Sequence, residues 1–168
     1  TLDAKPLGDP VSGRKVMLYN NDVSMAICNP DKQMDYFYKN GEGDEVIFVH
    51  YGTGTLESQY GSLDYHDGDY IVIPRGVIYK VVTKSEKTKF MVIESKSPVY
   101  TPARYKNSYG QYLEHSPFCE RDFRVPETLI TVDEKGEFLV KIKKFNKLHH
   151  YIFDYHPFDI VGWDGYFY

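Results

Sequence analysis

Two stretches decide the fold of this sequence: "GDEVIFVHYGTGTLES" at Gly43–Ser58 and "GDYIVIPRGVIY" at Gly68–Tyr79. Each contains runs of β-branched and aromatic residues that end at glycine or proline, which is the pattern of short strands joined by tight turns. Similar runs outside these stretches extend the pattern, and the predicted strands are Val16–Tyr19, Val23–Cys28, Met34–Tyr38, Val46–Tyr51, Gly54–Gln59, Tyr70–Pro74, Val77–Val82 and Phe90–Ser95. No window shows sustained helical periodicity, so we predict an all-β, antiparallel sandwich or barrel.

Composition excludes several classes of protein. The 168 residues suffice for one domain with a real core, and the 16% aromatic content, including 16 tyrosines, suits sheets and interfaces. A net charge of −4 with both signs mixed gives no electrostatic case for nucleic acid or an anionic membrane surface. The longest apolar runs are too short to span a bilayer, and Cys28 and Cys119 cannot form a disulfide framework. We therefore expect a cytoplasmic protein without nucleic-acid or membrane partners.

The spacing of turn residues resembles the motifs of the cupin superfamily, which are small β-barrels of the jelly-roll type. Glu45, six residues and Gly52 match the second half of the first motif. Gly68, Pro74 and Gly76 match the second motif, and such residues fix tight corners between barrel strands. The resemblance implies a cupin-like β-sandwich or jelly-roll barrel.

Histidines that hold the metal of a cupin are missing from this sequence. In that superfamily they supply neutral imidazole ligands to a divalent metal. The first two positions fall around Tyr38–Gly41, which reads Tyr-Lys-Asn-Gly, and Tyr79 stands at the position of the last histidine. We predict that the barrel is retained without a metal site, and we interpret Glu45 as an ion-paired or turn-stabilising carboxylate.

Several separated blocks, in the right order, resemble the N-terminal part of the homogentisate 1,2-dioxygenase family, particularly its bacterial members. They are "NNDVSMAI", "MDYFYKNGEGDEVIFVHYGTGTLES", "YGSLDYHDGDYIVIPRGVIY", "GQYLEHSPF" and "HPFDIVGWDGYFY". The resemblance implies Fe(II)- and O2-dependent opening of the ring of homogentisate, in tyrosine and phenylalanine catabolism. It also implies that two His and one Glu hold the iron in a C-terminal barrel, that the N-terminal barrel is structural, and that the protein is a homo-oligomer.

This resemblance suggests a division of the chain. Residues 1–98 would form the degenerate cupin barrel, and residues 99–168 a loop-rich connector and an extra hairpin that lead to an iron cupin outside this chain. We place the hairpin in "LITVDEKGEFLVKIKKF", with its turn at Asp133–Gly136. Basic residues that alternate with apolar ones in and after this stretch are interpreted as the wet face of a strand: Lys141, Lys143, Lys144 and Lys147. The apolar terminus "GWDGYFY" leads us to expect a piece of a longer protein.

Asp164 is the candidate catalytic residue. It follows Trp163, where the better-known eukaryotic members of the family carry an acid/base histidine. An aspartate could accept a substrate hydroxyl proton if burial raised its pKa, and the alternative is a turn residue in Asp-Gly. The substrate would be homogentisate or a related aromatic. The adjacent His149 and His150 would face opposite ways if they lay on a strand, so we expect no metal triad there, and we expect His156 in a structural or interface role.

Three functions remain open from the sequence. The first is the structural part of the dioxygenase, inactive alone, with Fe(II), O2 and the aromatic substrate bound by the intact protein. The second is a free-standing degenerate cupin that binds a small molecule or a partner without catalysis. The third is a sugar-modifying cupin of the isomerase type, for which no acid/base pair is identifiable.

Overall fold

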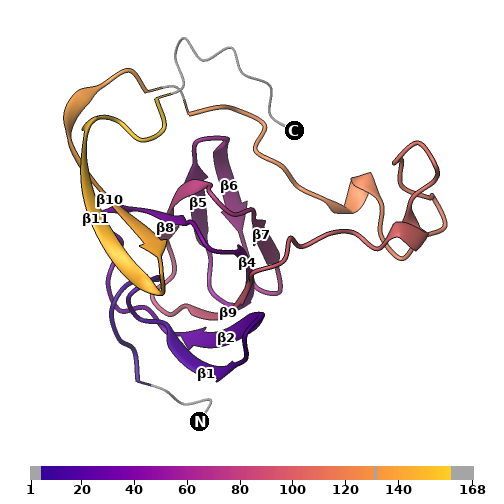
Figure 1. Ribbon diagram of the computed structural model, residues 1–168, viewed down its shortest axis with the longest axis horizontal. Helices are drawn as coiled ribbons and strands as arrows, with labels where there is room; N and C mark the ends of the chain where they lie inside the picture. Colours follow the sequence, from indigo (N-terminus) through magenta and orange to yellow (C-terminus); the bar gives the residue numbers. More distant parts are fainter. Residues whose placement is uncertain (1–4, 131, 160–168) are drawn as a thin grey trace.

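Two β-sheets packed against each other form the protein (Figure 1). The computed structural model describes residues 5–130 and 132–159. One sheet has five strands in the order β1 (Lys15–Tyr19), β2 (Val23–Cys28), β9 (Lys89–Ser95), β4 (Asp44–Tyr51) and β7 (Tyr70–Ile73). The other has six, in the order β11 (Lys147–Tyr155), β10 (Lys135–Lys144), β3 (Phe37–Asn40), β8 (Ile78–Thr83), β5 (Gly54–Ser58) and β6 (Gly61–Tyr65). The predicted all-β sandwich, with a loop-rich extension and an extra hairpin, is confirmed.

Strict alternation along β4 explains why the two sheets enclose a core. Glu45, Ile47 and Val49 point inward and are at most 1% exposed, while the residues between them are half-buried. The largest buried side chains are aromatic, and tyrosines predominate among them: Tyr36, Tyr38, Tyr65, Tyr79 and Phe90. A buried tyrosine contributes a large apolar ring but its hydroxyl needs a partner. The core of this barrel therefore needs polar groups inside it.

Glycines form the predicted barrel corners. Gly52 has a φ of +115°, and a Cβ there would lie 2.6 Å from Oγ1 of Thr88. Gly76 has a φ of +91° at the corner that leads into β8. Both conformations disfavour residues with a side chain, so the turn residues of the two motifs are needed for these corners.

The extra hairpin exists, but its predicted turn is wrong. The structure starts β10 at Lys135, inside the expected turn, and places the turn at Phe145 and Asn146, which have φ values of 53° and 54°. The second strand, β11, was not predicted. The Asp-Glu-Lys-Gly sequence is a good turn signal, but pairing of β10 with β3 and with β11 outweighs this local preference.

Two of the four lysines that we predicted on the solvent-exposed face of a strand are half-buried instead. β10 runs parallel to β3, with Lys141 opposite Tyr38 and Lys143 opposite the next inward-facing residue, Asn40. Lys141 lies 3.5 Å from the ring centre of Tyr36, and Lys143 forms an ion pair inside the mouth of the barrel. Lys144 and Lys147 are exposed, as expected.

A long excursion leaves the sandwich between β9 and β10 and projects to one side (Figure 1). Its described residues, 96–130 and 132–134, contain two short 3-10 turns, η1 (Ala103–Tyr105) and η2 (Glu120–Asp122), and no strand. Aromatic side chains pack against one another within it, with ring centres 5.2 to 6.3 Å apart: Tyr105, Tyr112, Phe118 and Phe123. Among residues 5–130 and 132–159, no helix is long and apolar enough to cross a membrane.

Candidate functional site

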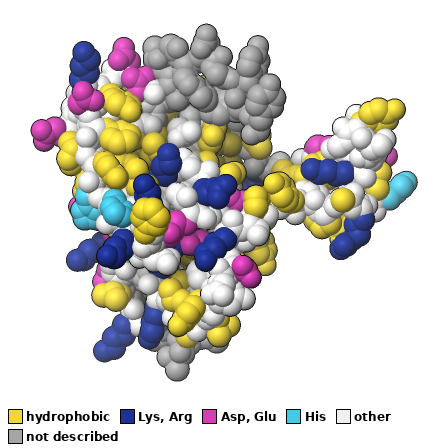
Figure 2. Space-filling view, in the orientation of Figure 1, with side chains coloured by type: hydrophobic (Ala, Val, Ile, Leu, Met, Phe, Trp, Pro, Cys, Tyr) yellow, Lys and Arg dark blue, Asp and Glu magenta, His cyan; other side chains and the backbone are white. Residues whose placement is uncertain are grey.

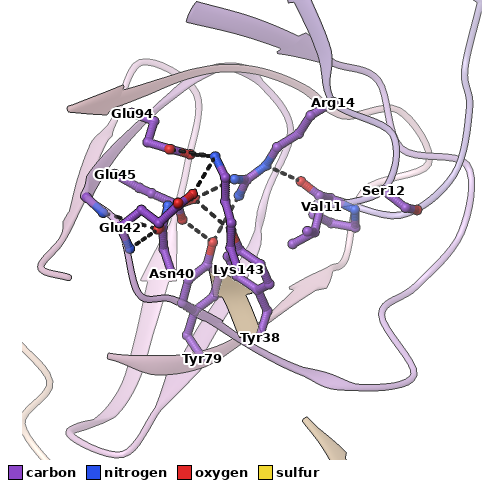
Figure 3. Close-up of polar contacts among 12 residues, drawn as sticks. Val11, Ser12, Arg14, Tyr38, Asn40, Glu42, Glu45, Tyr79, Glu94 and Lys143 are labelled. Atoms are coloured by element: carbon purple, nitrogen blue, oxygen red, sulfur yellow. Dashed lines mark hydrogen bonds and ion pairs between the residues drawn. The ribbon is translucent and has the colours of Figure 1, made fainter. Parts of the chain in front are cut away.

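Glu45 is the centre of the barrel's polar interior. It is fully buried, because inward-facing positions of β4 are closed off by the opposite sheet. Donors from three separate parts of the chain reach its carboxylate: Arg14, Asn40 and Tyr79 (Figure 3). Tyr38 is more distant, with its hydroxyl 3.4 Å from Oε1 of Glu45. The side chains converge on one point inside the barrel.

Arg14 supplies the positive charge. Its Nη1 lies 2.6 Å from Oε1 of Glu45, and its Nη2 donates to the hydroxyl of Tyr79 at 2.9 Å. Its Nε donates to the carbonyl of Pro10 at 3.0 Å, and its guanidinium lies 5.5 Å from the ring centre of Tyr38. A planar guanidinium that is fixed at three nitrogens holds one orientation in the barrel.

A tight turn before Arg14 aims it into the barrel. Asp9 organises this turn: its Oδ1 accepts the backbone N–H groups of Val11 and Ser12 at 2.8 and 2.9 Å. The same oxygen accepts the hydroxyl of Tyr36, a core residue, at 2.8 Å. The N-terminal segment is thus attached to the core, and Arg14 enters as part of a preformed turn.

The neutral partners are oriented by further hydrogen bonds. Asn40 accepts the backbone N–H groups of Glu42 and Gly43 with its Oδ1, so its Nδ2 faces Glu45 at 3.1 Å. Tyr79 donates its hydroxyl proton to Oε2 of Glu45, and its ring meets Tyr38 edge to face at 5.4 Å. Both carboxylate oxygens are therefore engaged.

Electrostatics keep the pair charged. Burial alone would raise the pKa of Glu45. The charge and hydrogen bond of Arg14, together with the hydrogen bonds of Tyr79 and Asn40, outweigh burial and lower that pKa. Burial raises the pKa of Tyr79 far above its usual range, so this phenol stays a neutral donor. Burial would lower the pKa of Arg14, yet the carboxylate beside it raises that pKa. The site is a carboxylate–guanidinium pair among neutral donors.

This set of residues does not fit a divalent metal. Metal ligands must present lone pairs, and the Glu45 oxygens are already used by N–H and O–H donors. The guanidinium of Arg14 adds a fixed positive charge that would repel a cation. Within the described ranges, no group of three His, Cys, Asp or Glu side chains is arranged to hold a metal ion.

The sequence identified the acid but missed its counter-ion. Glu45 is ion-paired, as one of the two interpretations stated. The sequence placed the missing ligand positions only within Tyr38–Gly41. In the structure, the side chains of Tyr38 and Asn40 point inward from β3, and both contact Glu45. Arg14 lies 31 positions before Glu45, in the segment that precedes the first predicted strand at Val16. The one signal available was that a buried carboxylate requires a cation.

The other sequence candidates lie away from this site. His149 and His150 alternate on β11, the first half-buried and the second exposed. His156 packs its ring 5.1 Å from Phe37 and 5.3 Å from Phe158, which is a structural contact. Burial raises the pKa of the Cys28 thiol to about 12, which disfavours a thiolate. Asp164, the candidate catalytic residue, lies outside the described residues.

Together the two sheets, the motif corners and the buried pair define a β-sandwich in which Asn40 and Tyr79, at positions where the motif spacing predicts metal ligands, donate to Glu45 instead. The chain belongs to the family described as homogentisate 1,2-dioxygenase N-terminal, whose model matches residues 11–168.

The chain is also similar in sequence to proteins described as dioxygenases. The chain is 37% identical to "Putative dioxygenase SSO1533" of Saccharolobus solfataricus, over 100% of this chain and 43% of that protein. It is 26% identical to the homogentisate 1,2-dioxygenase of Emericella nidulans, over 96% of this chain and 34% of the relative. It is 30% identical to that of Legionella pneumophila strain Corby, over 82% and 32%. The chain thus spans less than half the length of these relatives.

Similar solved structures include a cupin-2 domain protein from Shewanella frigidimarina, with a TM-score of 0.44 and 26% identity over 49% of this chain and 78% of that one. KdgF from Halomonas sp. has a TM-score of 0.46 and 17% identity, over 54% of this chain and 84% of its own.

We predict that Arg14→Met destabilises the protein by about 3 kcal/mol or more, because it leaves Glu45 charged and unpaired in the core. Urea unfolding followed by tryptophan or tyrosine fluorescence would measure the change. Arg75→Met is the matched control, since Arg75 is exposed, and it should change stability by no more than about 0.5 kcal/mol. Equal effects of the two substitutions would contradict the role of Arg14.

Acid should weaken the protein through Glu45. The pKa of Glu45 in the folded chain is below its usual value of 4.5, so the unfolded chain binds the proton more tightly. The stability contributed by the ionised carboxylate is therefore complete above about pH 4.5 and is lost as pH falls through the folded pKa. Urea unfolding at several pH values between neutral and acidic should show a steeper acid loss in the native protein than in Glu45→Gln. Parallel pH profiles would argue against a lowered pKa.

Proposed function

We propose that this chain is the structural N-terminal part of an Fe(II)-dependent dioxygenase that opens the aromatic ring of homogentisate. The observation that carries the proposal is the engagement of Glu45 by Arg14, Asn40 and Tyr79, at the positions where a cupin binds metal. Family membership supports the reaction class. Because the chain spans 43% or less of its relatives, we assign the iron ligands and the ring opening to residues outside it.

In the intact protein, iron would provide open coordination positions for O2 and for the oxygens of the substrate. The contribution of this chain is different: its buried ion pair fixes the barrel interior without a metal. A barrel that is held by internal contacts can serve as a rigid wall for a neighbouring catalytic barrel. The fragment alone is therefore expected to be inactive.

Exposed apolar side chains support contacts with further protein. β1 is an edge strand with every residue exposed, including Leu18 at 65% and Tyr19 at 82%. Hydrophobic side chains also lie along the projecting excursion (Figure 2), where Tyr109 is 89% exposed. Apolar surface of this kind is typical of interaction sites. We propose that these surfaces contact the C-terminal cupin and other subunits of a homo-oligomer.

The division of the chain follows the same proposal. Residues 1–98 would be the degenerate barrel, and residues 99–168 the connection to the iron barrel, with the β10–β11 hairpin attached to the first unit through β3. Asp164 remains our candidate for the group that accepts a substrate hydroxyl proton. The two cysteines, both buried free thiols, are compatible with the cytoplasm as its compartment.

Oxygen uptake tests the proposed function. The intact protein with added Fe(II) should bind iron stoichiometrically and consume O2 with homogentisate, while residues 1–168 alone should bind no stoichiometric iron. Asp164→Asn should lower kcat with iron content unchanged if this residue transfers a proton.

Two outcomes would overturn parts of this proposal. Iron-loaded protein that consumes no O2 with homogentisate would remove this substrate. Tight, stoichiometric iron binding by residues 1–168 would contradict the metal-free barrel. A gene that ends after Tyr168 would favour the free-standing, non-catalytic cupin instead.

A further inference from the structure

A separate cavity of about 190 Å³ opens at the mouth of the barrel, beside the buried pair. The tip of the β10–β11 hairpin forms one side of it, with Lys143 and Leu148. Strands β2 and β9 form the other side, with Ala26 and Val92. Arg14 lines the cavity, whereas Glu45 lies behind it and does not. The cavity therefore has contact with the charged interior but is distinct from it.

One part of the lining is apolar. Val11, Ala26, Val92 and Leu148 line it together with Tyr38. A dry cavity of about 150 Å³ in another protein accommodates benzene, so this space is large enough for a single six-membered ring. The apolar part indicates a ligand with a compact hydrocarbon body.

The polar part of the lining has unused donors. A guanidinium has five N–H donors, and among the described residues Arg14 uses one on each of its three nitrogens. Lys143 contacts both oxygens of Glu94, at 2.5 and 2.6 Å, and has a third proton (Figure 3). The one carboxylate in the lining, Glu94, is thus engaged. The charged side chains with protons to spare are donors, and Ser24 and Asn146 in the lining can donate as well as accept, so the lining can bind a ligand that accepts.

The rim adds one further cation to this lining. Arg14 is balanced by Glu45, and Lys143 by Glu94, while Oε2 of Glu42, which has no hydrogen-bond partner among the described residues, lies 4.0 Å from Lys143 but outside the lining. Lys147 also lines the cavity and is exposed, and it forms no ion pair within the part of the chain that the structure describes. An acidic group placed between Arg14, Lys143 and Lys147 would meet donors on several sides.

We propose that this cavity binds a small monocarboxylate with an apolar, ring-sized body. The carboxylate accepts from the remaining donors of Arg14 and Lys143 and is attracted by Lys147, while the body packs against Ala26 and Val92. Because the lining comes from the hairpin tip, from β2 and from the N-terminal turn, the ligand stabilises their contact. The proposal does not depend on the ring-opening reaction, which we assign to residues outside this chain.

Benzoate and its neutral isostere benzamide test the proposal, titrated into the full chain and followed by amide chemical shifts. Benzoate should bind with a Kd no weaker than roughly 10 mM, the value expected for its few non-hydrogen atoms. Benzamide should bind about tenfold more weakly or worse, because it loses charge-assisted hydrogen bonds. No benzoate binding at that concentration, or equal affinity for both compounds, overturns the proposal.

Variants locate the site. Ala26→Leu should fill the cavity and abolish benzoate binding while thermal stability is unchanged or higher, which separates ligand loss from unfolding. Lys147→Gln should weaken benzoate binding by about fivefold. The control is Lys87→Gln, in the turn that precedes the N-terminal end of β9 and outside the lining, and it should leave benzoate affinity unchanged. Benzoate affinity that survives Ala26→Leu, or that falls equally in both lysine variants, contradicts this cavity as the site.

Discussion

A carboxylate without access to water must meet a positive charge, and in this barrel Glu45 meets Arg14. The inward alternation of β4 leaves Glu45 no route to solvent, so its counter-ion has to come into the barrel. That requirement explains the N-terminal turn. Asp9 accepts hydrogen bonds from the backbone of this turn and from the hydroxyl of Tyr36, and the turn directs the guanidinium of Arg14 inward. It also explains why the core tolerates Tyr79, whose hydroxyl has both a donor and an acceptor beside it.

The pair takes over the physical task of a bound cation. In a metal-binding cupin, the bound ion balances the charge of the glutamate and orients the neutral histidines and the glutamate around it. Here the glutamate is present, neutral donors occupy the other positions, and the cation is a side chain of the same polypeptide. A covalently attached cation cannot dissociate, so the interior keeps one arrangement irrespective of metal supply. This property suits a barrel whose proposed role is support.

The sequence predicted the fold well where local chemistry determines it. Corner glycines and alternating strands are visible in the two motif stretches, and the structure confirms the sandwich. The short strand β6, with Gly61, Ser62 and Asp64 among its five residues, lacks an apolar run and was not predicted. The hairpin turn was misplaced, because β10 begins at Lys135 by pairing with Tyr155 of β11, and pairing of Val140–Lys143 with β3 adds to this arrangement.

The site was predictable only in part. The missing histidines and the isolated acid could be read from motif spacing, but the identity of the cation could not. Arg14 is adjacent to a glycine in a segment without strand pattern, and only the folded chain brings it to Glu45. The inward direction of Lys143 was misread for a related reason, since the parallel pairing of β10 with β3 has no local signature. Contacts between charged residues that are far apart in the chain are the hardest feature to predict from a single sequence.

A double-mutant cycle between Arg14 and Glu45 tests the central claim most directly. Arg14→Met, Glu45→Gln and the double variant would be compared with the native protein by urea unfolding at neutral pH. A buried, directly bonded pair predicts a coupling free energy of about 2 kcal/mol or more, with the double variant far more stable than the sum of single losses implies. A coupling below about 0.5 kcal/mol, the range of exposed pairs, would contradict the account.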